Sequence, residues 1–279
     1  MTGGRQSGGS ECPLRLATWN INSVRARLDR VLEFLRRSDV DVLAIQETKV
    51  ADAGFPAAAV AELGYQVAHH GLNQWNGVAV LSRVGLDDVQ VGFPKMPMFG
   101  EPQVAEARAV SAVCAGIRVW SLYIPNGREI GHPHFHYKLA WMAALREYGA
   151  AALAADPTLQ MAFCGDYNIA PTDADVWSPA FFQGRTHVTP DERAAFTALV
   201  DAGFTDLARP FTAEPRTFTY WDYTQLRFQK KQGMRIDFVL GTPPLADRAI
   251  GATIDIDERK GKGASDHAPV IIELEGSRQ

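Results

Sequence analysis

Several side chains able to bind a metal or move a proton stand where an apolar run of the sequence begins or ends. The runs fall within residues 16–20, 42–47, 161–168, 234–240 and 262–272. The side chains are those of Asn20, Glu47, Asp166, Asp237 and the adjacent pair Asp266 and His267. Apolar runs of this length are typical of buried strands. Together they predict one acidic active site assembled from the ends of many strands.

Glu47 follows the apolar run 42–46. An ionised carboxylate at the end of a buried strand needs a cation or hydrogen-bond donors, because its desolvation alone is too costly. We interpret Glu47 as a ligand of Mg²⁺, an ion that proteins usually hold through few carboxylates and several waters. The alternative is that the chain simply leaves the core there. Asn22 or Ser23, which follow the first run, can equally serve as helix caps.

The string Gly165-Asp166-Tyr167-Asn168 is the most informative short motif. The glycine permits a sharp exit from the strand and leaves Asp166 and Asn168 two residues apart on the same side. Asp166 could then orient or deprotonate a water molecule, while the Asn168 amide donates to a phosphoryl oxygen. A plain turn is the alternative explanation.

Asp237 lies in the middle of an apolar run and needs a partner if it is buried. We expect that partner to be His267, whose tautomer Asp237 would fix and whose pKa it would raise. His267 could then donate to an anionic oxygen. Asp266, beside it, could reach the metal.

Tyr123 and Arg128 flank the loop after another apolar run, where a hydroxyl could contact a phosphate and a guanidinium a nucleic-acid backbone. Residues 218–223 alternate large rings ahead of the basic residues 227–231, a combination that suits unstacked bases or a flipped-out sugar, although core packing would explain many of those rings. His132, His134 and His136 have alternate spacing in a Pro-containing loop without a nearby carboxylate, which is poor geometry for zinc.

The elements that must position these side chains follow from hydrophobic periodicity. Amphipathic helices are predicted near 24–37, 55–63, 134–155 and 190–202, the last with Thr189 as cap and Pro190 in its first turn. Strands are predicted near 14–19, 40–46, 65–69, 77–83, 107–114, 117–124, 160–165, 217–221, 234–240 and 268–274, with a hairpin joining 107–114 to 117–124 through Ala115-Gly116. Two packed mixed sheets flanked by helices, in a single domain over 14–279 after a disordered tail at 1–13, fit this order.

Composition limits the classes of function. A formal net charge of −4 argues against a protein that coats nucleic acid through bulk positive charge, although local basic clusters form at 25–30, 227–235 and 259–262. The three cysteines are too far apart for a zinc site or a disulfide framework. No run approaches the length of a membrane span and the N-terminus does not read as a signal peptide, so we expect a reduced cytoplasmic protein, monomeric and not bound to membranes.

Seven ordered strings of the chain resemble the exonuclease III family of apurinic/apyrimidinic endonucleases, within the DNase I-like phosphodiesterase superfamily. The resemblance covers residues 14–275. The strings are 17–23, 45–49, 76–83, 123–127, 164–170, 235–237 and 265–269. The resemblance implies a four-layered α/β sandwich whose two mixed sheets present the site at one edge.

Carried over by position, the resemblance implies that Glu47 holds Mg²⁺, or Mn²⁺ in its place, with help from Asn20 and Asp266. Asp166 would activate water, and Tyr123, Asn168 and the Asp237-supported His267 would stabilise charge on the phosphoryl oxygens. Family accounts differ over whether the Asp or the Tyr takes the proton. The residues that would contact duplex DNA carrying abasic sites or blocked or recessed 3' ends are Asn126, Arg128, Arg25, Arg227 and Lys230, with Tyr220, Trp221 and Met234 at the sugar pocket.

Three other functions compete with a Mg²⁺-dependent repair nuclease that cuts 5' to abasic sites and trims 3' ends. An inositol-phosphate phosphatase or a sphingomyelinase would share the catalytic strings, but the absence of a secretion signal and the string 234–237 speak against them. A non-catalytic binding protein should have lost at least one of the candidate groups. An enzyme that is chiefly an exonuclease would differ only in its sugar pocket.

Overall fold

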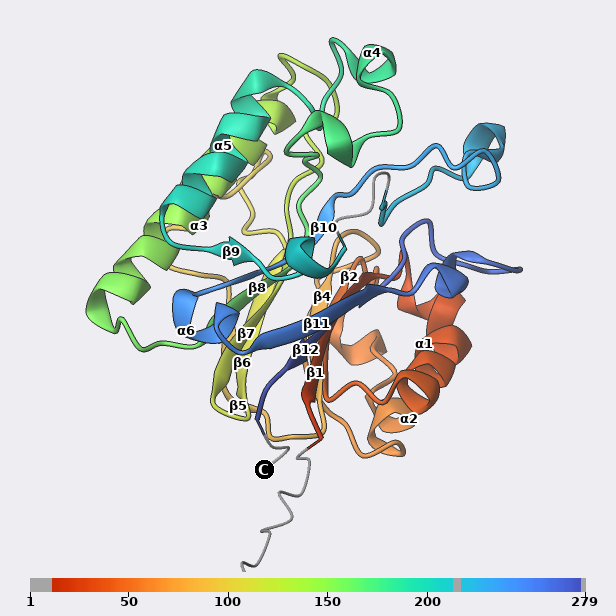
Figure 1. Cartoon of the computed structure of the whole chain (residues 1–279), viewed down its shortest axis with the longest axis vertical. Coiled ribbons are helices and arrows are strands. Elements are labelled where there is room, and N and C mark those ends of the chain that lie inside the picture. Colours follow the sequence, from red (N-terminus) through yellow and green to blue (C-terminus); the bar gives the residue numbers. More distant parts are fainter. Residues whose placement is uncertain (1–11, 213–216, 277–279) are drawn as a thin grey trace, which may run out of the picture.

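The computed structural model describes residues 12–212 and 217–276 and shows two six-stranded sheets packed face to face (Figure 1). The first sheet has the order β11-β12-β1-β2-β4-β3 and the second the order β5-β6-β7-β8-β10-β9. Strands of the first sheet are β1 (Leu14–Asn20), β2 (Val42–Gln46), β3 (Gln66–His70), β4 (Val78–Ser82), β11 (Ala249–Ile254) and β12 (Val270–Leu274). Those of the second are β5 (Asp87–Val91), β6 (Ala109–Cys114), β7 (Ile117–Tyr123), β8 (Met161–Asp166), β9 (Thr205–Asp206) and β10 (Asp237–Gly241).

Helices cover the outer face of each sheet (Figure 1). The helices are α1 (Val24–Ser38), α2 (Ala57–Ala61), α3 (Pro133–Ala155), α4 (Pro179–Phe182), α5 (Pro190–Asp201) and α6 (Pro243–Ala246), with short 3₁₀ turns at Asp52–Gly54, Asp173–Asp175, Arg209–Phe211, Thr224–Leu226 and Ile256–Arg259. Apolar residues of α1 and α2 pack on the first sheet, and those of α3 and α5 pack on the second. A third apolar cluster lies between the sheets. These layers confirm the predicted α/β sandwich.

Alternation along the strands builds these layers. In β2, Val42 and Ala44 face the other sheet, whereas Leu43 and Ile45 face α1. Both faces are apolar because both are covered, which is why such strands read as continuous apolar runs. The predicted hairpin is confirmed, since β6 and β7 pair antiparallel and Cys114 faces Ile117 across the turn.

One predicted strand is wrong, and three strands were not predicted. Residues 217–221 form no strand; Tyr220 alone makes isolated bridges, to Met234 and His267, while Phe218 and Trp221 are buried in a small apolar cluster. The predicted strand at 234–240 begins only at Asp237. β5, β9 and β11 were missed because they are short or partly exposed and lack an apolar run.

Residues 1–11 of the predicted tail lie outside the described residues. Within 12–212 and 217–276, none of the helices has the length and apolarity that crossing a membrane requires.

Candidate active site

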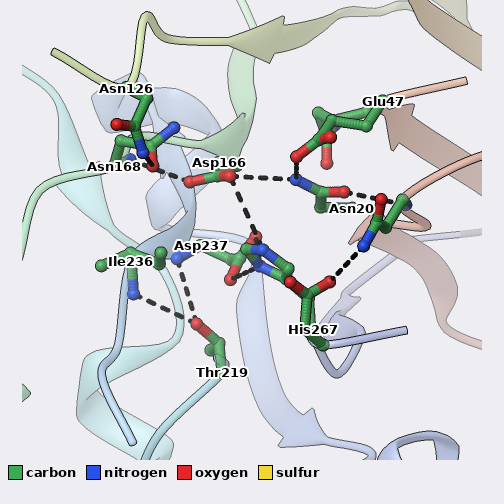
Figure 2. Close-up of polar contacts among 12 residues, drawn as sticks. Asn20, Glu47, Asn126, Asp166, Asn168, Thr219, Ile236, Asp237 and His267 are labelled. Atoms are coloured by element: carbon green, nitrogen blue, oxygen red, sulfur yellow. Dashed lines mark hydrogen bonds and ion pairs between the residues drawn. The ribbon is translucent and has the colours of Figure 1, made fainter. Parts of the chain in front are cut away.

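The ends of strands from both sheets meet at one place, as the sequence predicts (Figure 2). In the first sheet, parallel pairing puts Asn20 beside Gln46, the residue before Glu47. In the second, parallel pairing puts Tyr123 beside Asp166, and antiparallel pairing puts Asp237 on the other side of Asp166. The acidic and amide side chains therefore converge across the two sheets.

Asn20 links the carboxylates of the two sheets. Its Nδ2 donates to Glu47 Oε1 at 2.8 Å and to Asp166 Oδ2 at 3.0 Å, and its Oδ1 accepts from the Asn22 amide at 3.0 Å. The side chain is completely buried. With its amide nitrogen facing two carboxylates, Asn20 orients Glu47 rather than offering an oxygen to a cation in this arrangement.

Glu47 is held in an ionised form. Burial alone would raise the pKa of its carboxyl, but the Lys49 ammonium, 2.7 Å from Oε2, and the Asn20 amide lower the pKa. The Glu47 backbone has a φ of 55°, in the left-handed region, and its carbonyl accepts from the Ser23 amide at 2.7 Å. This turn fixes the carboxylate immediately after β2. Ser23 occupies the N-cap position of α1 without a side-chain cap bond.

Asp237, His267 and Asp166 form a buried relay. The Asp237 carboxylate lies 2.9 and 3.1 Å from His267 Nδ1, and His267 Nε2 lies 3.8 Å from Asp166 Oδ2. Thr219 Oγ1 accepts from the Asp237 amide at 3.1 Å and so fixes the strand start (Figure 2). Burial lowers the pKa of His267, but the carboxylates of Asp237 and Asp166 outweigh burial and raise it to about 10. The imidazole is therefore a cation with a free donor, Nε2, that faces Asp166.

Asp166 has the properties of a proton acceptor near neutral pH. Burial raises its pKa, and the carboxylates of Asp237 and Glu47 raise it further, whereas the His267 cation opposes them; the result is a pKa of about 7. Asp166 Oδ1 accepts from the Asn168 amide at 2.8 Å, which fixes the carboxylate. A base works best when its pKa lies close to the operating pH.

Tyr123 stays protonated. Burial raises the pKa of its phenol well above the usual value, and the carboxylates of Glu47 and Asp166 add to that effect, while the Arg108 guanidinium lies 5.0 Å from the ring centroid. A neutral phenol is a donor rather than a base at neutral pH. This electrostatic difference favours Asp166 as the proton acceptor of the two.

Asn168 is fixed from several sides. Its Nδ2 donates to the Ile124 carbonyl at 3.0 Å, and its Oδ1 accepts from Asn126 Nδ2 at 3.0 Å and lies 3.0 Å from His187 Nε2. The Asn168 backbone has a φ of 51°. Sequence reasoning missed His187, because nothing in the local pattern of residues 184–188 distinguishes it from a loop histidine.

Among the described residues, one group of three side chains has ligand atoms close enough together for a metal. One ligand atom from each of Glu47, Asp166 and His267 lies within 4.8 Å of the others. The two carboxylates suit a hard cation such as Mg²⁺, whereas a protonated His267 donates instead of ligating. Asp266 is not in this group: its Oδ1 accepts from Asn22 Nδ2 at 3.1 Å. Of the two carboxylates predicted as ligands, Glu47 and Asp266, only Glu47 therefore lies in this group of acidic and histidine side chains.

The predicted DNA contacts fall into four places. Asn126 and Arg128 are exposed on the loop after β7, and Arg25 is exposed on α1. The Tyr220 ring centroid lies 4.9 Å from that of His267, with the two rings tilted by 56°, and Tyr220 makes a bridge to the buried Met234. Lys230 is exposed, and the Arg227 guanidinium lies over the Phe181 ring at 4.5 Å.

The structure does not support Trp221 as one of the DNA-contacting residues. Its side chain is only 4% exposed and packs edge-on against Phe228 with ring centroids 5.3 Å apart. Its amide donates to the Asp266 carbonyl at 2.9 Å. Trp221 thus holds the Asp266-His267 segment and does not present its ring to a ligand.

Comparisons with known proteins agree with this geometry. The profile of the endonuclease/exonuclease/phosphatase family matches residues 17–267. Exodeoxyribonuclease III of Haemophilus influenzae is 31% identical over 277 residues, which cover 94% of this chain and 100% of the relative. A 3' phosphatase from Neisseria, solved with a product DNA hairpin, is 35% identical with a TM-score of 0.88, and an AP endonuclease from Archaeoglobus fulgidus is 34% identical with a TM-score of 0.87; each comparison covers 94% of this chain and 100% of the other.

Proposed function

The chain belongs to the endonuclease/exonuclease/phosphatase family, and we propose that it is a Mg²⁺-dependent DNA repair nuclease. Its reactions would be hydrolysis of the phosphodiester 5' to abasic sites, 3'–5' exonucleolytic trimming and removal of 3' blocking groups from duplex DNA. The observation that carries the proposal is the buried network in which Asn20 joins Glu47 to Asp166 and Asp237 supports His267. It supplies a cation site, a base and a cationic donor within one small space.

Each side chain has its own role in the proposed reaction. Asp166 takes a proton from water as the water oxygen bonds to phosphorus; the bond from phosphorus to the 3' oxygen breaks, and that oxygen takes a proton from solvent. The products are a 3'-hydroxyl and a 5'-phosphate. His267 donates through Nε2 to a phosphoryl oxygen, and the Tyr123 hydroxyl and the second Asn168 amide hydrogen stabilise the same developing charge. Mg²⁺, held by Glu47 with Asp166 beside it, would supply Lewis-acid stabilisation of that charge.

The DNA strand would run over the loops around this site. Asn126 and Arg128 offer donors beside Asn168, and Tyr220 and Met234 offer apolar surface beside His267. The Arg227 guanidinium rests on aromatic rings and donates to the side-chain oxygens of Gln225 and Gln232, so its charge can also face a phosphate. Such contacts give affinity without reading the sequence. We also propose that the protein acts as a single domain, monomeric and cytoplasmic.

The test is cleavage of a labelled duplex containing one tetrahydrofuran abasic analogue, in Mg²⁺ or in EDTA. Wild type should incise 5' to the lesion only with Mg²⁺, and Asp166→Ala should abolish incision. Asp173→Ala is the matched control, because that carboxylate lies seven residues further on and is exposed.

Other results would redirect the assignment. Incision of recessed or blocked 3' ends without incision at the analogue would favour a 3'-end enzyme, a second candidate supported by the similarity to a Neisseria 3' phosphatase. Failure of folded wild type on every DNA substrate would refute the proposal and favour an inositol-phosphate or lipid substrate.

A further inference from the structure

A buried ion pair lies behind the active site and takes no part in the chemistry proposed above. Lys138 of α3 and Glu192 of α5 are both completely buried, and their charged atoms are 2.5 Å apart. Ammonium and carboxylate groups are seldom buried this fully, because desolvation costs more than the pair usually returns. The position of the pair therefore calls for an explanation.

The Lys138 ammonium has three acceptors for its three hydrogens. Besides Glu192, Nζ donates to the Asn168 carbonyl at 2.6 Å and to the Asn126 carbonyl at 3.3 Å. Asn168 follows β8 and Asn126 follows β7, so one ammonium joins the two loops that carry the amide side chains of the site. Their side chains are themselves bonded at 3.0 Å.

Glu192 is fixed as rigidly as the lysine. Its Oε2 accepts from the Thr189 amide at 3.1 Å and from Thr189 Oγ1 at 2.8 Å, within the capping box of α5. Gly127 packs so closely that an added Cβ would lie 3.3 Å from Lys138 Cδ. The ammonium consequently cannot follow a shift of either loop without losing a bond.

We propose that Lys138 is a positioning residue, which holds the main chains of Asn168 and Asn126 so that their amides face the reacting phosphate; this inference rests on the function proposed above. Stability alone does not account for the pair, because well-packed apolar side chains of similar volume often replace a buried ion pair without loss. Apolar side chains cannot donate to the two carbonyls. Lys138 thus acts through Asn168, whose main-chain carbonyl it binds at 2.6 Å.

The double variant Lys138→Met, Glu192→Leu separates positioning from stability. Lys138→Met alone should lower the melting temperature, since it leaves Glu192 buried without its partner, and the double variant should recover most of that loss. In both variants we expect kcat for DNA cleavage to fall by about 10- to 100-fold, the order of loss that a small misplacement of a reacting group causes. The Mg²⁺ concentration for half-maximal rate should stay unchanged, because Glu47 is not contacted.

Two further variants make the test specific. In an Asn168→Ala background the same double substitution should cause a much smaller loss of kcat than in wild type, since one of the two side chains that Lys138 positions is gone. Arg83→Met is the matched control: it removes a guanidinium 2.8 Å from the buried Asp41, before the start of β2, and should lower stability while kcat per folded molecule stays at the wild-type value.

The outcomes are distinct. A double variant with wild-type kcat, or with an additive loss in the Asn168→Ala background, would overturn the positioning role while wild-type cleavage of DNA still supports the proposed function. A wild type that cleaves no DNA would instead count against that function. A crystal structure of the double variant gives a readout independent of activity: we expect residues 125–127 and 167–169 to shift, and an unchanged main chain would contradict the inference.

Discussion

Replacing Asp237 by Asn tests the buried relay with the smallest change of shape. The side chain keeps its size and its position at the start of β10, where Thr219 binds the main-chain amide, but it loses the charge that faces His267 Nδ1. The substitution places a neutral amide beside the His267 imidazole, which is 3% exposed. His267 then has to hold its proton with Asp166 as its nearest carboxylate.

The magnitude follows from the bond that is lost. Hydrogen bonds to charged groups contribute about 1.5–3 kcal/mol, and this one is short and shielded from solvent. If the His267 cation stabilises charge only in the transition state, the same free energy appears in the barrier, so kcat should fall by about 10- to 150-fold. KM for DNA should change little, because the donation from His267 strengthens only as charge builds on the phosphoryl oxygens in the transition state.

The dependence of kcat on pH gives an independent readout. The pKa of His267 is raised to about 10 by Asp237 and Asp166 against the effect of burial, so wild type should keep its cationic donor through neutral and mildly alkaline pH. In Asp237→Asn the alkaline limb of kcat should move to lower pH, because the principal carboxylate that raises the pKa is gone.

The assay is steady-state cleavage of the abasic-analogue duplex from pH 6 to 10, with circular dichroism to confirm folding. Thr219→Val serves as the control, since it removes the bonds to the Ile236 and Asp237 amides but leaves the carboxylate. A folded Asp237→Asn protein that keeps more than a third of wild-type kcat, with an unmoved alkaline limb, would refute the role assigned to the relay.

Three further expectations follow from the same structure. Glu47→Gln should raise the Mg²⁺ concentration for half-maximal cleavage by at least about tenfold, because one charged ligand is lost; an unchanged Mg²⁺ titration would remove Glu47 from the metal site. Arg227→Gln should reduce the slope of log affinity for DNA against log salt by about 0.9, measured by fluorescence anisotropy in EDTA, while Arg146→Gln on α3 should leave it unchanged; equal slopes in all three proteins would argue against a phosphate contact. Burial and the Arg108 charge lower the pKa of His134 to about 4, so the unfolded chain takes up that proton first, and the contribution to stability is present above pH 6.5 and lost as the pH falls toward 4. Urea melts at pH 6.5 and 4.5 should show a loss of roughly 1 kcal/mol after solvent screening, and His134→Gln should lack that part of the loss.

Sequence patterns predicted the sandwich and the convergence at its edge because both depend on local signals. An apolar run that begins or ends at a carboxylate or an amide marks both the strand and the place where its side chain emerges. Parallel pairing brings together the ends of β1 and β2 and of β7 and β8, and antiparallel pairing puts the start of β10 beside the end of β8. That is how Asn20, Glu47, Asp166 and Asp237 could be grouped before any contact was known. β5 escaped prediction because it begins with two aspartates and its two valines are exposed, so it contains no apolar run.

Local sequence patterns do not predict contacts between residues that are far apart along the chain. The rings at 218–223 read as a strand and as a binding surface, yet tertiary packing buries Phe218 and Trp221 and leaves Tyr220 against His267. Lys138 looks like an ordinary helix lysine, and only Glu192, 54 residues later, and two carbonyls from separate loops make its burial possible. Lys138 adds a bond to the main-chain carbonyl of each loop, whereas the loops' own side chains join them through Asn126 and Asn168. Positioning groups of this kind therefore lie on helices behind the strand ends, where local sequence gives no sign of them.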